Sequence, residues 1–581
     1  MSAQSYGRCS VMLAAVILSA YASSALAGLV KSEYADFEGG PQWLPASTDG
    51  LAGTPGPALA GGTVGLLAPL NASSASVPLS FKGVSQFDLR RLLGGSFIPP
   101  DTHGAVGASQ FMETTNGVYG IYSKSTGALQ TMMDARQFWA NAGMTDGSGL
   151  NGDARISYDK ASNKWIALQF GKSVADIQIA VSTTADAMGP WRSTKFTGFA
   201  GGTADYPTLA IDKDAIYIAT NNFNAANMFA GTTLNVFARS DLLGPGAPTT
   251  ASLKQFVTPY SGGPADQDRG FAIQGVNSNS STFSGQIISA SLFSNDSLRY
   301  GITNPGSTGA TEGPVTFLGL ADYGANGGGR QPDGTRNIDT LDQRIGASAW
   351  EHDGKIYAVY TATPVGGTHT EVRFVVTDAA TNAVIQQGSI GDATHDYYQG
   401  SLTVNSAGQV VIGFDRSGFG ADGNISFLAR TYNSDSSGRL IQTNELLLHT
   451  STVNDYHNGS VEGAAASGRQ RWGDYSAVTL DPSDDANFWA IGEYAELWNN
   501  AGGCGSAVPA ISGCTLSGGS SWGTWISEIR LDLLAATVPE PGSCALVFLG
   551  LAAAGITTRR KNTLAWSRAR GGSNEPALCT G

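Results

Sequence analysis

The sequence predicts an all-β protein, organised as a seven-bladed β-propeller. Three observations predict this class: the composition, the density of turn-forming residues and the recurrence of one three-strand unit. Glycine accounts for 76 of the 581 residues, against roughly 7% in an average protein. That content argues against an all-helical protein, because glycine destabilises helix interiors. The chain is 41% hydrophobic and 9% aromatic, which supplies a core and excludes a fully disordered chain.

The repeated unit is an apolar strand opened by a polar turn and followed by two further strands. Gly, Asp or Asn separates the strands, and each strand runs for five to eight residues, as is typical of β-structure. A fourth, more polar strand fits residues 191–199 and 441–450. Seven such four-stranded sheets would pack face to face in a closed ring that protects their edges. The seven copies span residues 102–123, 154–183, 207–240, 271–302, 346–378, 400–431 and 475–531.

The last copy lacks an obvious fourth strand. Residues 84–92, VSQFDLRRL, precede the first copy and would supply that strand, which would close the ring. A pair of β-sandwiches and a parallel β-solenoid are the alternatives. A solenoid needs shorter and stricter repeats, and sandwich strands would not recur as the same unit. We therefore place the propeller at residues 97–535, after a Gly/Ala/Pro/Ser-rich lead-in at residues 28–96.

The N-terminal segment, residues 1–27, predicts a secretory signal peptide. Arg8 is followed by an apolar run at 11–20 and by an A-x-A cleavage site at Ala25-Leu26-Ala27. An uncleaved membrane anchor is the alternative, but the apolar run is shorter than the roughly 20 residues that a bilayer span needs.

The C-terminal segment, residues 538–561, has three parts. Pro539-Glu540-Pro541 is followed by the apolar run 543–556 and then by Arg559 and Arg560. These features resemble the PEP-CTERM sorting signal of exported Gram-negative proteins. The resemblance implies an exosortase partner, transient inner-membrane anchoring by a short transmembrane helix, and delivery to the cell envelope, cell surface or matrix. It also implies an association with exopolysaccharide and biofilm. The apolar run is marginal for a bilayer span, and a plain membrane anchor is the alternative. The basic tail, 562–581, departs from the family, which usually ends just after the basic residues.

Cys504 and Cys514 are the only cysteines between the two terminal signals. In an exported protein, two cysteines ten positions apart favour one disulfide that closes a small loop. A zinc site would need further ligands, and no histidine lies near this pair. The formal net charge of −13 argues against nucleic acid as a partner, because phosphate binding needs a basic surface.

The polar turns that open the units are the candidate functional residues. In a propeller the first strand of each sheet lines the central channel, so these turns should converge on one rim. A ring of carboxylates and guanidiniums suits a sugar, a carboxylate or a cation; no cofactor is required, and Ca²⁺ is the ion it would accept. The alternative is structural, since Asp often caps a turn and would pair with Arg between sheets. The candidates are Asp101, His103, Arg155, Asp205, Arg269, Arg344, Asp396, Arg471 and Asp474, with Asp153 and Asp342 as neighbouring carboxylates.

Arg155, Arg344 and Arg471 occupy comparable points of three repeats. The body thereby resembles, in part, the sialidase-like propellers, in which three arginines grip a carboxylate. Residues 182–191, STTADAMGPW, fall where sialidases carry an Asp-containing turn, but they lack the S-x-D-x-G-x-T-W spacing. No Tyr–Glu pair stands out as nucleophile and base, so no catalytic residue is assigned. The six histidines show no metal-binding spacing, and no G-x-S-x-G motif is present.

We therefore expect an exported surface or matrix protein that binds polysaccharide or another protein without catalysis. The alternative is a sialidase-like glycan hydrolase or lyase that acts at the channel rim.

Replacing Pro539, Glu540 and Pro541 by alanine should leave the protein uncut and held in the membrane, because the sorting motif is the recognised part of the signal. Fractionation and mass determination of the product measure this. Deletion of residues 562–581 is the control and should change little. Normal processing and release of the alanine variant would overturn the assignment of the motif.

Overall fold

The computed structural model describes residues 42–45, 74–147, 149, 152–260, 268–452, 456–457, 469–498 and 520–532. One compact unit ends at Asp532, and residues 533–581 form a second unit outside the described residues. The expected signal peptide, the cysteines 504 and 514 and the sorting motif also lie outside them. Within the described part of the chain, no helix is long and apolar enough to cross a membrane.

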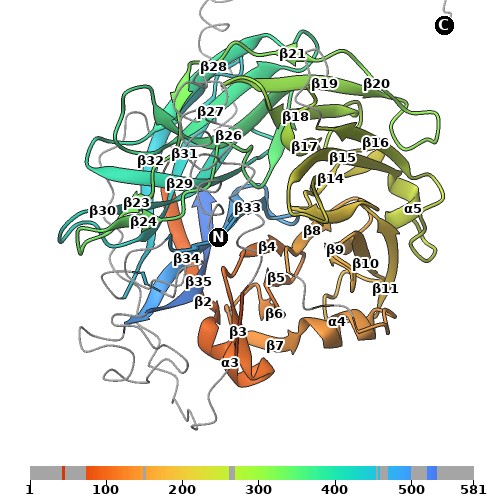
Figure 1. Ribbon diagram of the computed structural model, residues 1–581, viewed down its shortest axis with the longest axis horizontal. Coiled ribbons are helices and arrows are strands. Elements are labelled where there is room, and N and C mark those ends of the chain that lie inside the picture. Colours follow the sequence, from red (N-terminus) through yellow and green to blue (C-terminus); the bar gives the residue numbers. More distant parts are fainter. Residues whose placement is uncertain are drawn as a thin grey trace, which may run out of the picture. The chain divides into compact units, whose positions relative to one another are not determined.

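The described chain is a succession of antiparallel sheets, each running from an inner to an outer strand (Figure 1). The first three sheets correspond to the first three predicted units. They are β4 (His103–Val106), β5 (Gln110–Thr115), β6 (Val118–Ser123) and β7 (Leu129–Asp134); β8 (Arg155–Asp159), β9 (Lys164–Phe170), β10 (Asp176–Ser182) and β11 (Trp191–Thr197); and β12 (Gly202–Asp205), β13 (Ala210–Ile211), β14 (Ala215–Asn224), β15 (Phe229–Ala238) and β16 (Lys254–Pro259).

The next two predicted units join into a ten-stranded sheet, because their inner strands β17 and β25 pair in parallel. Its strands are β17 (Phe271–Asn277), β18 (Gln286–Ala290), β19 (Ser297–Thr303), β20 (Thr311–Glu312), β21 (Thr316–Phe317), β22 (Tyr323–Gly324), β25 (Ala349–His352), β26 (Lys355–Pro364), β27 (Glu371–Asp378) and β28 (Val384–Ile390).

The last two units form four-stranded sheets. Among the described residues, two short strand pairs and three helices lie outside these sheets. The strands are β29 (His395–Val404), β30 (Gln409–Gly418), β31 (Ser426–Ser434) and β32 (Leu440–Thr450); then β33 (Ala477–Leu480), β34 (Asn487–Trp498), β35 (Ser520–Leu531) and β2 (Ala75–Ser85). The pairs are β1 (Gln42–Pro45) with β3 (Gly95–Ile98), and β23 (Gly329–Arg330) with β24 (Arg336–Ile338). The helices are α3 (Gln86–Leu93), α4 (Ala135–Asn141) and α5 (Arg239–Leu243).

An N-terminal segment closes the last sheet, as expected, but it is not the segment that the sequence indicated. β2 pairs antiparallel with β35, whereas most of residues 84–92 form α3. Ser85 and Asp88 explain the helix start: the Ser85 backbone N–H and hydroxyl donate to the Asp88 carboxylate at 3.0 and 2.7 Å, as in a capping box. The expected lead-in, 28–96, therefore contains an outer strand and a helix.

Burial explains why the units read as apolar runs. The strands in the middle of each sheet are covered on both faces, as in β14, where every residue except the last is buried. Outermost strands alternate instead, as in β16, where exposed residues follow half-buried ones. Strands covered on two faces have near-continuous apolar sequences, and strands covered on one face alternate.

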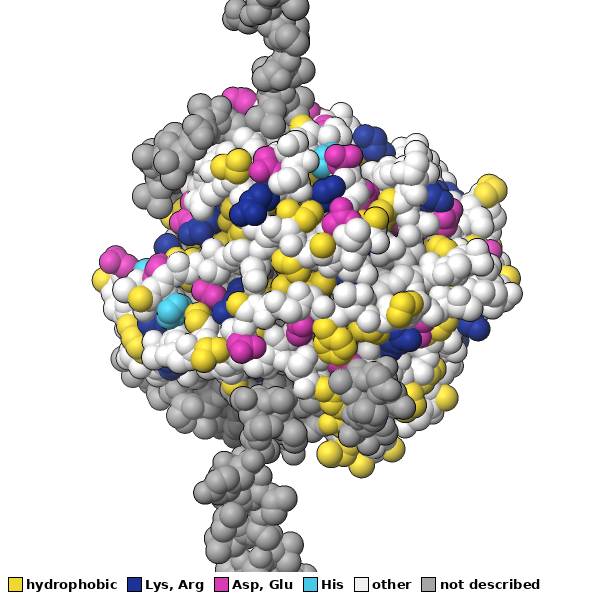
Figure 2. Space-filling model, turned by 90° about the horizontal axis from the view of Figure 1, so that it is seen from above, with side chains coloured by type: hydrophobic (Ala, Val, Ile, Leu, Met, Phe, Trp, Pro, Cys, Tyr) yellow, Lys and Arg dark blue, Asp and Glu magenta, His cyan; other side chains and the backbone are white. Residues whose placement is uncertain are grey.

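The apolar cores lie between neighbouring sheets rather than inside one layer. Each sheet shares a buried cluster with the next: β4–β7 with β8–β11, β8–β11 with β12–β16, and so on along the chain. The series closes where Phe111 and Tyr122 of the first sheet pack with Trp489 and Ile526 of the last, and β33 also contacts β4. Sheets packed face to face in a closed ring constitute a β-propeller. On the side shown in Figure 2, charged side chains are scattered among uncharged ones.

Candidate functional site

The segments that open the inner strands share an unusual backbone conformation. Six of the seven have, at or near the start of the inner strand, a non-glycine residue in the left-handed region, with φ between 44° and 58°. That conformation costs an L-residue about 1–2 kcal/mol, so neighbouring interactions must hold it. The residues are Asp101, Asp153, Tyr206, Ala272, Leu341 and Gln399.

A chain of hydrogen bonds joins several of these segments across the centre of the ring. The Asp101 carboxylate accepts the backbone N–H of Asp474 at 2.9 Å and the Asn116 amide at 2.6 Å. The Asn116 side-chain oxygen accepts the Asp153 N–H at 2.9 Å. The Asp153 carboxylate accepts the Tyr206 N–H at 3.2 Å. This series, which we call the closing chain, links the last sheet to the first, second and third.

Two of the predicted arginines form buried ion pairs beside the closing chain. Arg344 donates to the Asp342 carboxylate through Nε at 2.8 Å and Nη2 at 2.9 Å. Arg471 donates to Asp474 at 2.7 Å and lies 3.4 Å from Asp339. Arg344 also approaches Asp474 at 3.8 Å. The two arginines are 4% and 2% exposed, so these charges are balanced inside the protein.

The third arginine, Arg155, is held by aromatic rings. Its guanidinium carbon lies 3.3 Å from the centroid of the Tyr475 ring and 4.9 Å from that of Tyr206, and its Nε donates to the Pro207 carbonyl at 3.0 Å. The Arg344 guanidinium carbon also lies over the Tyr206 ring, 4.4 Å from its centroid. Such cation–π contacts stabilise a desolvated guanidinium. The predicted arginines therefore do converge, but in the interior rather than at an open channel mouth.

The space left at this centre is small. A cavity of about 20 Å³ corresponds to room for about one water molecule, whereas ligand pockets measure roughly 300–1,000 Å³. The described residues thus leave no space for a sugar ring here. Among the residues that line it are Tyr206, Arg344, Gln399, Asp474 and Tyr475.

The structure places two predicted residues away from this centre. Arg269 lies 3.6 Å from Glu312 and stacks 5.3 Å from the Tyr300 ring centroid. Asp396 is fully buried and accepts the Arg330 guanidinium at 2.7 Å. Each of the two therefore belongs to a local ion pair.

His103 and Asp205 lie nearer the centre. His103 Nδ1 accepts the Ile156 N–H at 3.3 Å, and its ring meets the Tyr475 ring edge-on, with centroids 5.9 Å apart. Burial is the main cause that lowers the pKa of His103 well below its ordinary value, with a further contribution from the Arg155 charge. Asp205 is buried at the end of β12.

The turn that suggested a sialidase motif docks onto the preceding sheet. Asp186 accepts the Gln110 amide at 2.8 Å, and the Ala187 N–H donates to the Gln110 side-chain oxygen at 2.8 Å. The turn at residues 183–190 does lie between the third and fourth strands of its sheet, and these bonds tie it to β5.

Several participants were not predicted from the sequence. Asn116 stands in an Asn-Gly turn, which reads as an ordinary hairpin signal. Glu113 accepts the Val84 N–H at 3.0 Å and the Tyr122 hydroxyl at 2.8 Å. Asp415 accepts the Trp472 indole N–H at 2.8 Å. A carboxylate inside an otherwise apolar strand is the signal that could have found the last two.

Burial dominates the electrostatics of these acids. It raises the pKa of Asp153 to about 7, with a further contribution from the Asp474 charge. It raises the pKa of Glu113 to about 7 and that of Asp415 to about 8. The pKa of Asp101 is also raised well above its ordinary value, by burial and by the charges of Asp474 and Asp153. Within the described residues, no group of three or more His, Cys, Asp or Glu side chains is arranged to hold a metal ion, so Ca²⁺ binding stays a prediction.

Comparison with known families matches one segment of the chain. Residues 537–561 match the model of the PEP-CTERM protein-sorting motif, which confirms the C-terminal resemblance and implies exosortase processing and export to the bacterial cell envelope. A sequence search finds no match among curated proteins.

Solved structures similar to this chain include several propellers, at low sequence identity. The WD40 repeats of RRP9 align with a TM-score of 0.35 and 8% identity over 81% of this chain and 100% of that one. The Dos1 propeller aligns with a TM-score of 0.35 and 10% identity over 78% of this chain and 95% of that one. The WD40 domain of SCAP from fission yeast aligns with a TM-score of 0.30 and 8% identity over 72% of this chain and 82% of that one. The propeller assignment rests on the sheet order and the cores between sheets.

Replacing Arg344 by alanine should destabilise the protein by about 3–5 kcal/mol, because it leaves the buried Asp342 carboxylate unpaired. Denaturant unfolding measures the loss. The control is Arg136→Ala, whose partner Asp134 is also two positions away. The Arg136 side chain is 48% exposed, so its loss should cost at most about 1 kcal/mol. Equal stability losses in the two variants would contradict the structural role of Arg344.

The stability of the protein should fall as pH rises from 6.5 to 8.5. Asp153, Glu113 and Asp415 have folded-state pKa values of about 7, 7 and 8, whereas unfolded carboxyls titrate near 4. The folded state therefore retains protons that the unfolded state has released, and deprotonation removes that stabilisation. His103 and His449 have lowered pKa values, so they are neutral in the folded state across this window. Unfolded histidines titrate near about 6.5, so they oppose the decline only at the lower end of the window. Melting temperatures across the window measure the effect.

The matched variant is Asp415→Asn, which keeps an acceptor for the Trp472 N–H but cannot ionise. Its melting temperature should decline less steeply than that of the parent between pH 7 and 8.5. A parent protein whose stability stays level or rises across this range would contradict the raised pKa values.

Proposed function

We propose that the chain is an exported, seven-bladed β-propeller that binds polysaccharide at the cell surface or in the extracellular matrix without catalysis. The sorting motif at residues 537–561 supports export and cleavage by an exosortase. The blade count is supported by the antiparallel meanders that begin at β4, β8, β12, β17, β25, β29 and β33.

The proposal that the protein is not catalytic rests on one observation: the acids at the centre of the ring are already bound to other protein groups. The Asp101 and Asp153 carboxylates accept the hydrogen bonds of the closing chain, and Asp342 forms an ion pair with Arg344. A glycosidase of the ordinary kind needs two carboxyl groups that face a sugar across roughly 5–10 Å. The convergent acids here are buried and committed to structural bonds, beside a cavity of about 20 Å³.

The loops between second and third strands favour binding at one rim of the ring. In a propeller, equivalent loops lie on the same face. Exposed apolar side chains stand in these loops in four of the sheets, and such groups pack against sugar faces or partner proteins. They are Val174, Met228, Val365 and Phe419, which are 40%, 50%, 68% and 50% exposed.

A glycan array with the exported protein, together with an assay for new reducing ends, tests the proposal. We expect retention on at least one polysaccharide and no release of reducing ends. The double variant Val365→Ser with Phe419→Ser should bind about a hundredfold more weakly or worse, because each apolar side chain buried against the ligand contributes about 1.5–3 kcal/mol.

Leu129→Ser is the matched control, since Leu129 is 50% exposed on the outer strand β7, away from these loops. It should bind as the parent does. Release of reducing ends would favour the hydrolase or lyase alternative, and failure to bind any glycan would overturn the proposal.

A further inference from the structure

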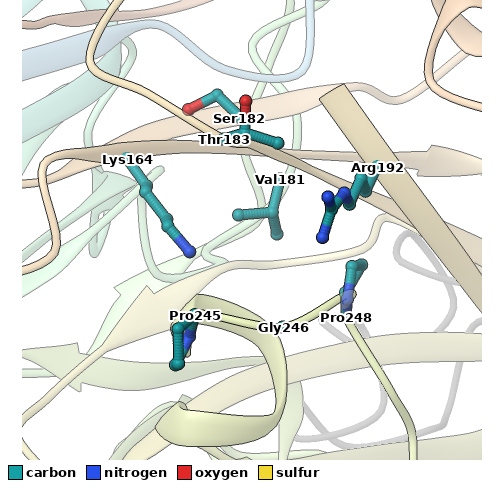
Figure 3. A pocket seen from close by; sticks show the side chains of 8 residues that line it. All are labelled: Lys164, Val181, Ser182, Thr183, Arg192, Pro245, Gly246 and Pro248. Atoms are coloured by element: carbon teal, nitrogen blue, oxygen red, sulfur yellow. The ribbon is translucent and has the colours of Figure 1, made fainter. Parts of the chain in front are cut away.

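A pocket lies at the seam between the sheet β8–β11 and the loop that follows α5. Figure 3 shows the Lys164 amino group and the Arg192 guanidinium pointing toward the same space from opposite sides. Its volume is about 70 Å³. We call it the seam pocket, and its lining consists of Lys164, Val181, Ser182, Thr183, Arg192, Pro245, Gly246 and Pro248.

Strand register places both cations on the face that packs toward the next sheet. Val181 of β10 lies opposite Arg192 of β11 and Ile166 of β9. Lys164 is two positions before Ile166, so it shares the same face of the sheet. Ile166 and Val181 pack with Leu243 of α5 in one buried cluster. The half-buried Lys164 and the exposed Arg192 therefore stand at the edge of an apolar seam.

Lys164 is held in place by backbone carbonyls. Its amino group donates to the Leu243 oxygen at 3.3 Å and to the Gly244 oxygen, both at the end of α5. An ammonium group has three donors, so one remains for a ligand. The lysine is thus fixed in position with spare hydrogen-bonding capacity.

The positive charge of the pocket is not neutralised by its walls. None of the eight lining residues is acidic. Asp159, which pairs with Lys164 in the strand register, binds Arg239 and the Ser162 hydroxyl instead. The Arg192 guanidinium makes no hydrogen bond or ion pair with another described residue. In a chain of net charge −13, two converging cations without an acidic neighbour favour an anion.

The volume selects the size of that anion. As in the central cavity, one water needs about 10–15 Å³, so 70 Å³ accepts a group of about five heavy atoms but not a sugar ring. From these observations we propose that the seam pocket binds one oxyanion, a carboxylate or sulfate group, carried by an acidic polysaccharide that lies outside it. Lysine and arginine both form charge-assisted hydrogen bonds to such groups. The site is separate from the loop rim, so it does not rest on binding there.

Affinity electrophoresis of the exported protein in gels that contain polygalacturonate, dextran sulfate or neutral dextran tests the inference. We expect retardation by at least one acidic polymer and none by neutral dextran. Arg192→Ala should weaken the retardation about tenfold or more, as expected for loss of a charge-assisted bond. Lys195→Ala is the matched control: Lys195 lies on the same strand with opposite orientation and pairs with Asp146, so this variant should behave as the parent does.

A second variant leaves both cations in place. No atom lies within 4 Å of a Cβ added to Gly246, so Gly246→Glu should fold normally and place a carboxylate at the mouth, which should abolish retardation. Free inorganic sulfate should compete with the polymer if one anionic group is what the pocket recognises. An equal effect of Arg192→Ala and Lys195→Ala, or no retardation of the parent by any acidic polymer, would overturn the proposal. The Val365/Phe419 double variant should retain this binding, which separates the two sites.

Discussion

The ring depends on the buried Asp101 carboxylate, which holds the point where the last sheet returns to the first. One of its oxygens accepts the N–H of Asp474, 373 positions later in the chain, and the other accepts the Asn116 amide. Because apolar cores lie between neighbouring sheets, an open ring would expose two core faces and two strand edges to water. The N-terminal strand β2, the outer strand of the last sheet, also bonds to the first sheet, because Glu113 of β5 accepts the N–H of Val84.

The same closure decides where a ligand can bind. Arg155, Arg344 and Arg471 meet at the centre, but there they stabilise the junction by stacking on tyrosines and by pairing with buried aspartates. A centre filled in this way leaves the loops of the rim and the seams between sheets as the accessible surfaces. The propeller thereby separates the residues that hold the ring together from the residues available to a partner.

The composition follows from this architecture. Only 14% of the residues are charged, since the middle strands of the sheets are buried on both faces and cannot carry ions cheaply. Charged side chains are therefore expected mainly on outer strands and loops, where water solvates them. The buried Asp101 and Glu113 carboxyls accept backbone N–H groups, and burial raises the pKa of each. Lys164 and Arg192 at the seam are therefore unusual in this acidic protein, because two cations line one pocket that has no acidic lining residue.

The sequence by itself determined the strands and their repetition, because hydrophobic periodicity is a local property. The run at 215–223, for instance, reappears as β14 with both faces covered. Even the convergence of the three arginines followed from their equivalent places in the repeats. The sequence did not reveal β2, whose single covered face leaves a weak pattern, or the capping pair Ser85 and Asp88 that turns the following residues into a helix. Only the tertiary structure decided which partners the arginines take and whether water reaches them. Those properties depend on side chains such as Asp101 and Asn116, which are brought together by the closure of the ring rather than by their spacing in the chain.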